Sequence, residues 1–351
     1  MIDLTKHHKL LLLLVVVSSF VVRMLFVDYS QLVSFDARIY FDFAQYVSSN
    51  VALPSHIYYL HNMGFPLTLA GLFHIILPFH NFDVPQLQNI QKIFTVIIST
   101  ATIPLIFAFC NKYFDKRYAL LGAVFFAFEP HLIQNSTFGI TEPLFIFFSL
   151  LAWCLFYSKS EKLIFISFVF VGLASITRLE GLMLYPLFLI LLHLKRKQLK
   201  PKNHLFLLSL IFIIPIIIII LIGNNDGTGG AFTAKITKEM IRSNQMIHDG
   251  ITINGIHKPI GQMIFNSFVY FGWSATTFLF FIPLGLYALS KHKQLCYELI
   301  LSLGVVSISG LVAYLHAYDT RYFFPAYPFF ILISLFCIKW LDAKVRLRLL
   351  S

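Results

Sequence analysis

The sequence predicts an all-α polytopic membrane protein with about ten transmembrane helices. Of its 351 residues, 58% are hydrophobic and only 12% are charged, and the mean hydropathy is +0.78. Apolar runs such as Leu10–Val22, Leu205–Ile222 and Thr276–Leu289 recur along the chain, and a transmembrane helix needs about 20 such residues. This composition excludes a soluble protein and predicts no separate soluble domain.

The distribution of basic residues predicts the topology. The net charge is +11, but Lys and Arg gather in short clusters between apolar runs, which argues against a nucleic-acid partner. Because basic loops stay in the cytoplasm, the clusters predict that both termini are cytoplasmic. The clusters are Lys6/Lys9, Lys112/Lys116/Arg117, Lys159/Lys162, Lys195 to Lys202, Lys291/Lys293 and Lys339 to Arg348. The spans between them are roughly 10–27, 89–110, 118–133, 142–157, 163–177, 181–194, 205–222, 264–289, 295–315 and 325–340.

Two outer segments follow from this topology, 28–88 and 223–262. The first contains Gly64–Phe82, an apolar run that would place every later basic cluster outside if it crossed the membrane. We therefore expect a juxtamembrane or re-entrant helix there, which is permitted where protein covers its backbone ends. The second begins with a flexible Gly/Asn-rich stretch and continues with an amphipathic pattern that predicts an interfacial helix. The whole chain, 1–351, is predicted to form one transmembrane domain.

Charged residues gather at four predicted outer helix ends. If the first segment is helical, Asp36, Tyr40 and Ala44 form one stripe at i, i+4 and i+8, whereas Asp42 lies about 240° further round than Asp36. Carboxylates are costly beside hydrocarbon and usually mark chemistry or transport there. The other groups are Thr141-Glu142 with Glu129 and His131, Arg178 with Glu180, and Asp319 with Arg321 and Tyr322.

Each group also has a purely structural explanation. Acidic residues near helix starts, such as Glu142 and Glu180, interact favourably with the helix dipole whatever the function. The side chains of Arg178 and Arg321 can reach phospholipid headgroups. Three histidines and four cysteines show no metal-ligand spacing, so no metal site or cofactor is predicted, although a divalent metal stays an open alternative. They are His56, His61, His131, Cys110, Cys154, Cys296 and Cys337.

A set of motifs occurs in a fixed order along most of residues 10–340. They are Asp36-x3-Tyr40-x3-Ala44, Gly64-Phe65-Pro66-Leu67, a span that begins near Lys92, Thr141-Glu142-Pro143-Leu144, Ile176-Thr177-Arg178-Leu179-Glu180-Gly181 and Arg321-Tyr322-Phe323-Phe324-Pro325. In this order they resemble the polytopic glycosyltransferases of the GT-C fold, specifically relatives of dolichyl-phosphate-mannose protein mannosyltransferases and of the bacterial aminoarabinose transferase that modifies lipid A. The sequence departs from those relatives at Ala37, where a second acid is common, and at Gly64-Phe65-Pro66, which replaces a basic-Pro-Pro motif.

The resemblance implies a GT-C-like bundle with outer juxtamembrane helices, and an inverting glycosyltransferase. The donor would be a sugar on a polyprenyl-phosphate carrier of the dolichyl-phosphate type, and the acceptor a hydroxyl of a lipid, glycan or protein on the outer face, beside membrane lipids. Asp36 would be the general base, and Glu142 a second catalytic carboxylate that orients the acceptor or holds an arginine. Cationic donors suit the leaving phosphate; Arg178, Arg321 and Tyr322 would bind it, while Tyr40 and Glu180 would orient the substrates.

Two other classes of protein remain as alternatives. A multi-pass transporter or flippase for a lipid-linked or anionic substrate would also carry charges within the membrane. Its charges would be expected near the midplane, whereas these lie at outer helix ends, and the chain shows no inverted repeat. A non-catalytic assembly subunit would leave the carboxylates and arginines without a shared pocket. A structure that brings Asp36, Glu142, Arg178 and Arg321 together would favour the enzyme.

Overall fold

The computed structural model describes residues 4–33, 35–50, 62–194, 212–214, 217, 251–253, 256–258, 260–317 and 320–350. In these ranges the chain is a helical bundle with one short antiparallel hairpin, formed by β1 (Ile251–Ile253) and β2 (Ile256–Lys258). The amphipathic helix expected in the second outer segment lies outside the described residues, as does nearly all of the predicted span 205–222.

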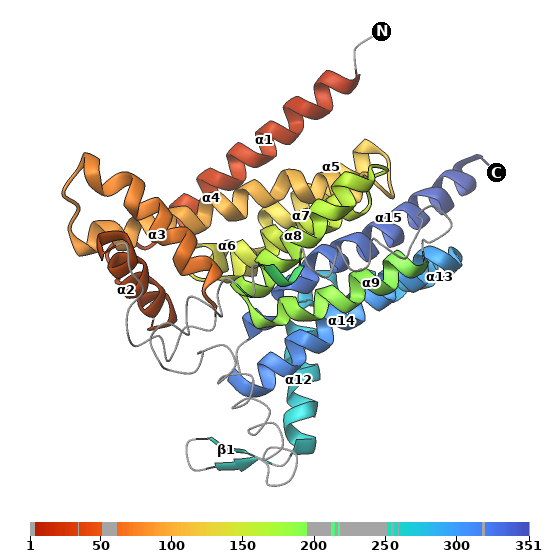
Figure 1. The fold of residues 1–351 in the computed structure, drawn as a ribbon. Helices are drawn as coiled ribbons and strands as arrows, with labels where there is room; N and C mark the ends of the chain where they lie inside the picture. Colours follow the sequence, from red (N-terminus) through yellow and green to blue (C-terminus); the bar gives the residue numbers. More distant parts are fainter. Residues whose placement is uncertain are drawn as a thin grey trace.

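Three helices in the described ranges are long and apolar enough to cross a membrane. The candidate span His7–Leu25 lies in α1 (Leu4–Leu25), and Val84–Cys110 is α4 (Val84–Cys110). The third, Arg321–Val345, begins in the 3-10 turn η5 (Thr320–Ala326) and continues through most of the last helix, α15 (Tyr327–Leu350). The two chain ends project from the same end of the bundle, as the predicted topology requires (Figure 1). An integral membrane protein is therefore supported, whereas a count of about ten spans stays a prediction.

The first half of the bundle continues beyond α4 with shorter helices. They are α5 (Lys116–Phe128), α6 (Pro130–Ser136), α7 (Glu142–Phe156), α8 (Glu161–Thr177), the 3-10 turn η2 (Leu179–Met183) and α9 (Leu184–Leu194). Of these, α5, α6 and α7 pack on α4, α8 packs on α7, and η2 and α9 pack on α8. Capping residues explain several of their starts. The Asp115 carboxylate accepts from the backbone N–H groups of Arg117 and Tyr118 at the start of α5. At α6 the Glu129 side chain caps the helix and Pro130 occupies its first turn, a position where proline loses no helical hydrogen bond.

The predicted span 264–289 is wrong as one continuous helix. The structure divides it into α12 (Ile260–Ser274), the 3-10 turn η4 (Thr276–Phe278) and α13 (Phe281–Ser290). Two features favour the break. Thr277 donates a hydrogen bond to the Glu129 carboxylate, 3.3 Å away. Pro283 lies in the first turn of α13, and a helix tolerates proline in its first turn but not in its interior. Beyond α13 follow α14 (Lys293–Ala317) and the turn η5 (Thr320–Ala326).

Aromatic side chains fill the main core, where α7, α9 and α15 meet. The Trp153 ring lies 4.6 Å from Phe188 and 5.5 Å from Phe329, centroid to centroid. Close packing of this kind must hold helices together in a bilayer, because lipid tails are as apolar as the side chains themselves.

Two further helices, α2 (Phe35–Asn50) and α3 (Gly64–Ile76), followed by the turn η1 (Leu77–Phe79), pack against each other at the end of the bundle opposite to the termini (Figure 1). A smaller apolar core joins them, and it includes the Phe41 and Phe73 rings at 5.8 Å. The helix predicted within Gly64–Phe82 is confirmed as α3, which is a short apolar helix rather than a full-length span.

Candidate active site

Asp36 lies in the first turn of α2 and faces the last segment of the bundle. Its carboxylate forms an ion pair with the Nη2 of Arg321, a residue of η5 that follows it by 285 positions in the sequence. The Asp36 side chain is 43% exposed and the Arg321 side chain 20%. The placement of an acid in the first helical turn also suits the dipole of α2. Asp42 points elsewhere, as the helical spacing predicts, and forms an exposed pair with Arg38 at 3.8 Å.

Arg321 also approaches a second carboxylate. Its Nε lies 3.5 Å from Oε1 of Glu142, the first residue of α7. That same Oε1 forms an ion pair with Nη1 of Arg178, and the Thr141 hydroxyl donates to Oε2 at 3.3 Å. Glu142 is only 2% exposed. A carboxylate buried this deeply is tolerated because two arginines and a hydroxyl surround it.

Arg178 is held on every side, at the junction of α8 and η2. Its Nη2 lies 2.8 Å from Oε1 of Glu180, its Nε donates to the same carboxylate at 3.4 Å, and its Nη1 donates to Thr141 at 3.2 Å. The guanidinium carbon lies 4.6 Å from the centroid of the Tyr322 ring, a favourable cation–π arrangement. Only 4% of the side chain is exposed. The Tyr322 ring and two carboxylates thus enclose this cation.

Together these residues form one network of alternating charge, which we call the charge network: Asp36, Arg321, Glu142, Arg178 and Glu180. Its members come from α2, α7, the α8–η2 junction and η5. The structure therefore brings together residues from all four groups of charged residues that the sequence singles out separately. Asp319, which belongs to the same motif as Arg321, lies outside the described residues.

Tyr40 stands one helical turn beyond Asp36 in α2. Burial raises the pKa of Tyr40 to about 12, the Glu142 and Asp36 carboxylates add to the rise, and a hydrogen bond from Asn62 and the charge of Arg178 oppose it. Asn62 Nδ2 lies 3.4 Å from the Tyr40 hydroxyl, and the Phe65 ring packs edge-on at 5.8 Å. The phenol is therefore protonated at neutral pH, so it can donate a hydrogen bond near the charge network.

A second polar cluster, around Glu129, was only partly foreseen. His131 Nδ1 lies 3.0 Å from the Glu129 carboxylate and 3.2 Å from the Tyr327 hydroxyl. Arg23 of α1 is fully buried nearby, and its Nη1 donates to the backbone carbonyl of Ala127 at 2.6 Å. The sequence motif Glu129-Pro130-His131 pointed to this cluster, whereas Arg23 sits alone in an apolar run and gave no signal.

The site contains no cluster of metal-ligating side chains among the described residues. In the ranges that the structure describes, no three or more His, Cys, Asp or Glu side chains are grouped so as to hold a metal ion. The carboxylates of the charge network form ion pairs with guanidinium groups. His56 and His61 lie outside the described residues.

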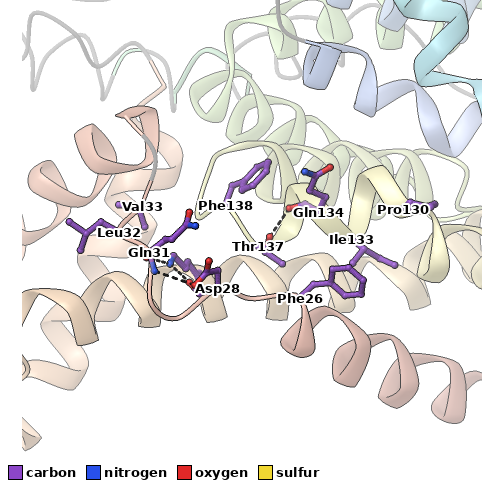
Figure 2. A pocket seen from close by; sticks show the side chains of 11 residues that line it. Phe26, Asp28, Gln31, Leu32, Val33, Pro130, Ile133, Gln134, Thr137 and Phe138 are labelled. Carbon is purple, nitrogen blue, oxygen red and sulfur yellow. Dashed lines mark hydrogen bonds between the residues drawn. The ribbon is translucent and has the colours of Figure 1, made fainter.

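A cavity of about 610 Å³ lies between the segment after α1, the first half of α4 and α6 with the residues that follow it (Figure 2). Lys92 fixes its rim, because Nζ donates to the backbone carbonyls of Asp28 and Gln31 at 2.6 and 2.5 Å. Val33 lines the cavity and packs on Ala37 and Ile140. Ala37 directly follows Asp36, so this packing connects the wall of the cavity to the start of α2. Its volume lies in the range of small-molecule sites.

Comparison with known proteins finds one matching family and several similar folds. Residues 88–220 match the family described as dolichyl-phosphate-mannose-protein mannosyltransferase. A search of curated protein sequences finds no significant match. Among solved structures, ArnT from Cupriavidus metallidurans in the apo state superposes with a TM-score of 0.64 at 11% identity, over 93% of this chain and 59% of that one.

Two structures of the Archaeoglobus fulgidus oligosaccharyltransferase are also similar. The complex with Zn and sulfate gives a TM-score of 0.60 at 15% identity, over 96% of this chain and 50% of that one. AglB in complex with an inhibitory peptide and a dolichol-phosphate gives 0.57 at 13% identity, over 99% and 52%. The chain spans about half to three fifths of the length of these proteins.

These likenesses define the class of protein. The chain is a membrane protein with a GT-C fold, related to the fold of the protein mannosyltransferases and of ArnT. The family match covers less than half of the chain, and it includes Glu142, Arg178 and Glu180 of the charge network.

Proposed function

We propose that the chain is an inverting glycosyltransferase that moves a sugar from a polyprenyl-phosphate carrier to an acceptor hydroxyl at the extracytoplasmic face. One observation carries this proposal, the charge network, in which a part-exposed carboxylate, Asp36, stands next to a part-exposed arginine, Arg321. A general base and a cation for the leaving group are the two parts that this reaction needs. The family match and the GT-C fold support the same reaction class.

The chemistry divides between these two residues. Asp36 accepts the proton of the acceptor hydroxyl as the oxygen bonds to the anomeric carbon of the sugar. The bond from that carbon to the phosphate oxygen breaks, and its electron pair stays on the phosphate. Arg321 stabilises the negative charge that grows there through its planar pair of N–H donors.

Glu142 and Arg178 act indirectly, through Arg321. Arg178 has its donors directed at Glu142, Glu180 and Thr141, so we assign it to holding Glu142 in place rather than to direct phosphate contact. Glu142 in turn orients Arg321. Tyr322 covers Arg178, and Tyr40 is placed to donate a hydrogen bond to a bound substrate.

The test is a transfer assay with the purified chain and a panel of polyprenyl-phosphate sugars. The expected result is release of free polyprenyl phosphate from at least one donor, with Asp36→Asn as the inactive control. Failure of all donors together with sugar-lipid movement across liposome bilayers would contradict the enzyme and support the flippase. The charge network lies at helix ends rather than in the middle of a long span, since Arg321 is the first residue of the span Arg321–Val345, and this favours the enzyme over a transport path.

A further inference from the structure

The two ends of the charge network differ in how firmly they are held. Glu142 and Arg178 are nearly inaccessible, at 2% and 4% exposed, and further partners surround both. Asp36 is 43% exposed, and in the described part of the chain its ion pair is with Arg321. A part-exposed pair is weak, because water solvates both ions well. A buried pair is costly to open, because the separated ions would be left poorly compensated in the protein interior.

A phosphate that binds Arg321 must compete with the carboxylates already there. Glu142 cannot leave, since Arg178 and Thr141 hold it in a buried position. Asp36 can turn toward water at small cost. Guanidinium pairs more strongly with a phosphate in bidentate geometry than with one part-exposed carboxylate oxygen. The pair between Asp36 and Arg321 is therefore the one that gives way.

We propose that Asp36 is a resident counter-anion that the donor phosphate displaces from Arg321, so that donor binding unmasks the general base. This inference rests on the proposed function, and it adds that the donor must bind before Asp36 can act as the base. Before the donor binds, the Asp36 carboxylate is engaged in its ion pair with the Arg321 guanidinium. Once the phosphate occupies Arg321, the carboxylate is free to accept the proton of the acceptor hydroxyl. The proton leaves to water after the polyprenyl phosphate departs, and the ion pair re-forms.

The inference makes an unusual demand on binding. Removing the charge of Asp36 should strengthen the binding of the anionic lipid, although Asp36 belongs to the active site. The probe is undecaprenyl phosphate, which carries no sugar, titrated in detergent against wild type, Asp36→Asn, Arg321→Ala and the double variant. Asp36→Asn should bind it up to about fivefold more tightly than wild type, which corresponds to the strength of an exposed ion pair. In the Arg321→Ala background, Asp36→Asn should change nothing.

A matched control separates displacement from a general change of charge. Asp42→Asn removes the same charge from the same helix, but Asp42 pairs with Arg38 on the surface, and its side chain is 60% exposed. It should leave the affinity unchanged. Equal tightening in the presence and absence of Arg321, or weaker binding by Asp36→Asn, would overturn the displacement. Arg321→Lys keeps the positive charge and serves as a second background in case Arg321→Ala does not fold. In the Arg321→Lys background, Asp36→Asn should still tighten the binding of undecaprenyl phosphate, but by less than in wild type. A wild-type protein that does not bind undecaprenyl phosphate at all would instead contradict the proposed function.

Discussion

At the scale of single residues, the candidate site is a gradient of burial along one line of alternating charges. Its outer end, Asp36 with Arg321, is accessible, and its inner end, Glu142 with Arg178, is enclosed. Chemistry with a lipid phosphate and a hydroxyl needs accessible groups, and the orientation of those groups needs rigid support. The two ends therefore have separate functions, and substitutions in them should have separate effects.

Asp36→Asn should abolish transfer. The amide keeps the size of the carboxylate but cannot accept the proton of the acceptor hydroxyl. Loss of a general base lowers the rate by roughly 10²–10⁴-fold, which the release of polyprenyl phosphate from the active donor would measure. Turnover within a few-fold of wild type would remove Asp36 from this role and move it to Glu142.

Arg178→Ala should destabilise the fold far more than Arg321→Ala does. The first substitution leaves the buried carboxylate of Glu142 without its main partner, at a cost of about 3–5 kcal/mol. The second breaks the part-exposed pair with Asp36, which is worth about 1 kcal/mol or less, and a longer contact of 3.5 Å with Glu142, which keeps Arg178 and Thr141 as partners. Thermal unfolding of both variants in the same detergent gives the comparison. Equal losses of stability would show that Arg178 is not a structural support for Glu142.

At the scale of elements, a close contact between two helices positions the inner end of the charge network. A Cβ built on Gly64, at the start of α3, would lie 2.8 Å from the backbone N and Cα of Thr177 and would also touch its hydroxyl. Thr177 ends α8 and directly precedes Arg178. The absence of a side chain at Gly64 thus permits α3 to approach the segment that carries the arginine.

Gly64→Ala should therefore lower activity by pushing α3 away from α8. A displacement of about 1 Å at a catalytic group can cost roughly 100-fold in rate, so a loss of tenfold or more is expected in the transfer assay. Gly71→Ala is the matched control, because it lies in the same helix with no atom within 4 Å of its added Cβ. It should keep full activity and gain about 0.5–1 kcal/mol of stability. The same activity in both variants would refute the positioning role of this contact.

At the scale of the whole molecule, the predicted topology places α2 outside and the turn between α7 and α8 in the cytoplasm. The placement of both termini at one end of the bundle is consistent with it (Figure 1). The side itself can be tested with Ser49, exposed in α2, and Ser160, exposed at the start of α8. Each is replaced by cysteine in a chain without Cys154 and Cys296, because the two other cysteines are buried.

An impermeant maleimide applied to intact cells should label the cysteine at position 49 and spare the one at position 160. Labelling at position 160 should appear only after permeabilisation. Labelling in the reverse order would invert the topology and remove an extracytoplasmic site from the proposal.

Much of this architecture can be predicted from local patterns, and the rest depends on distant contacts. The stripe of Asp36 and Tyr40 predicts the helix that the structure contains as α2, and positions at the ends of antiparallel helices are expected to meet on one side of a bundle. The sequence around each charged residue does not indicate its ion-pair partner, since Asp36 and Arg321 are 285 residues apart. The burial of Arg178 could not be foreseen either, because an arginine at a helix end is equally able to reach the headgroups. The break within 264–289 depends in part on a hydrogen bond from Thr277 to Glu129, a residue 148 positions earlier.

The gradient of burial along the charge network has a consequence for how the protein responds to salt. Mobile ions screen exposed charges, with a screening length of about 8 Å at 0.15 M and about 3 Å at 1 M, but they barely reach charges enclosed by protein. Added salt therefore acts on the pair of Asp36 and Arg321 and leaves Glu142, Arg178 and Glu180 almost untouched. Changing the ionic strength therefore weakens or strengthens the outer pair alone. It does so without any substitution, and the enclosed charges of Glu142, Arg178 and Glu180 stay paired.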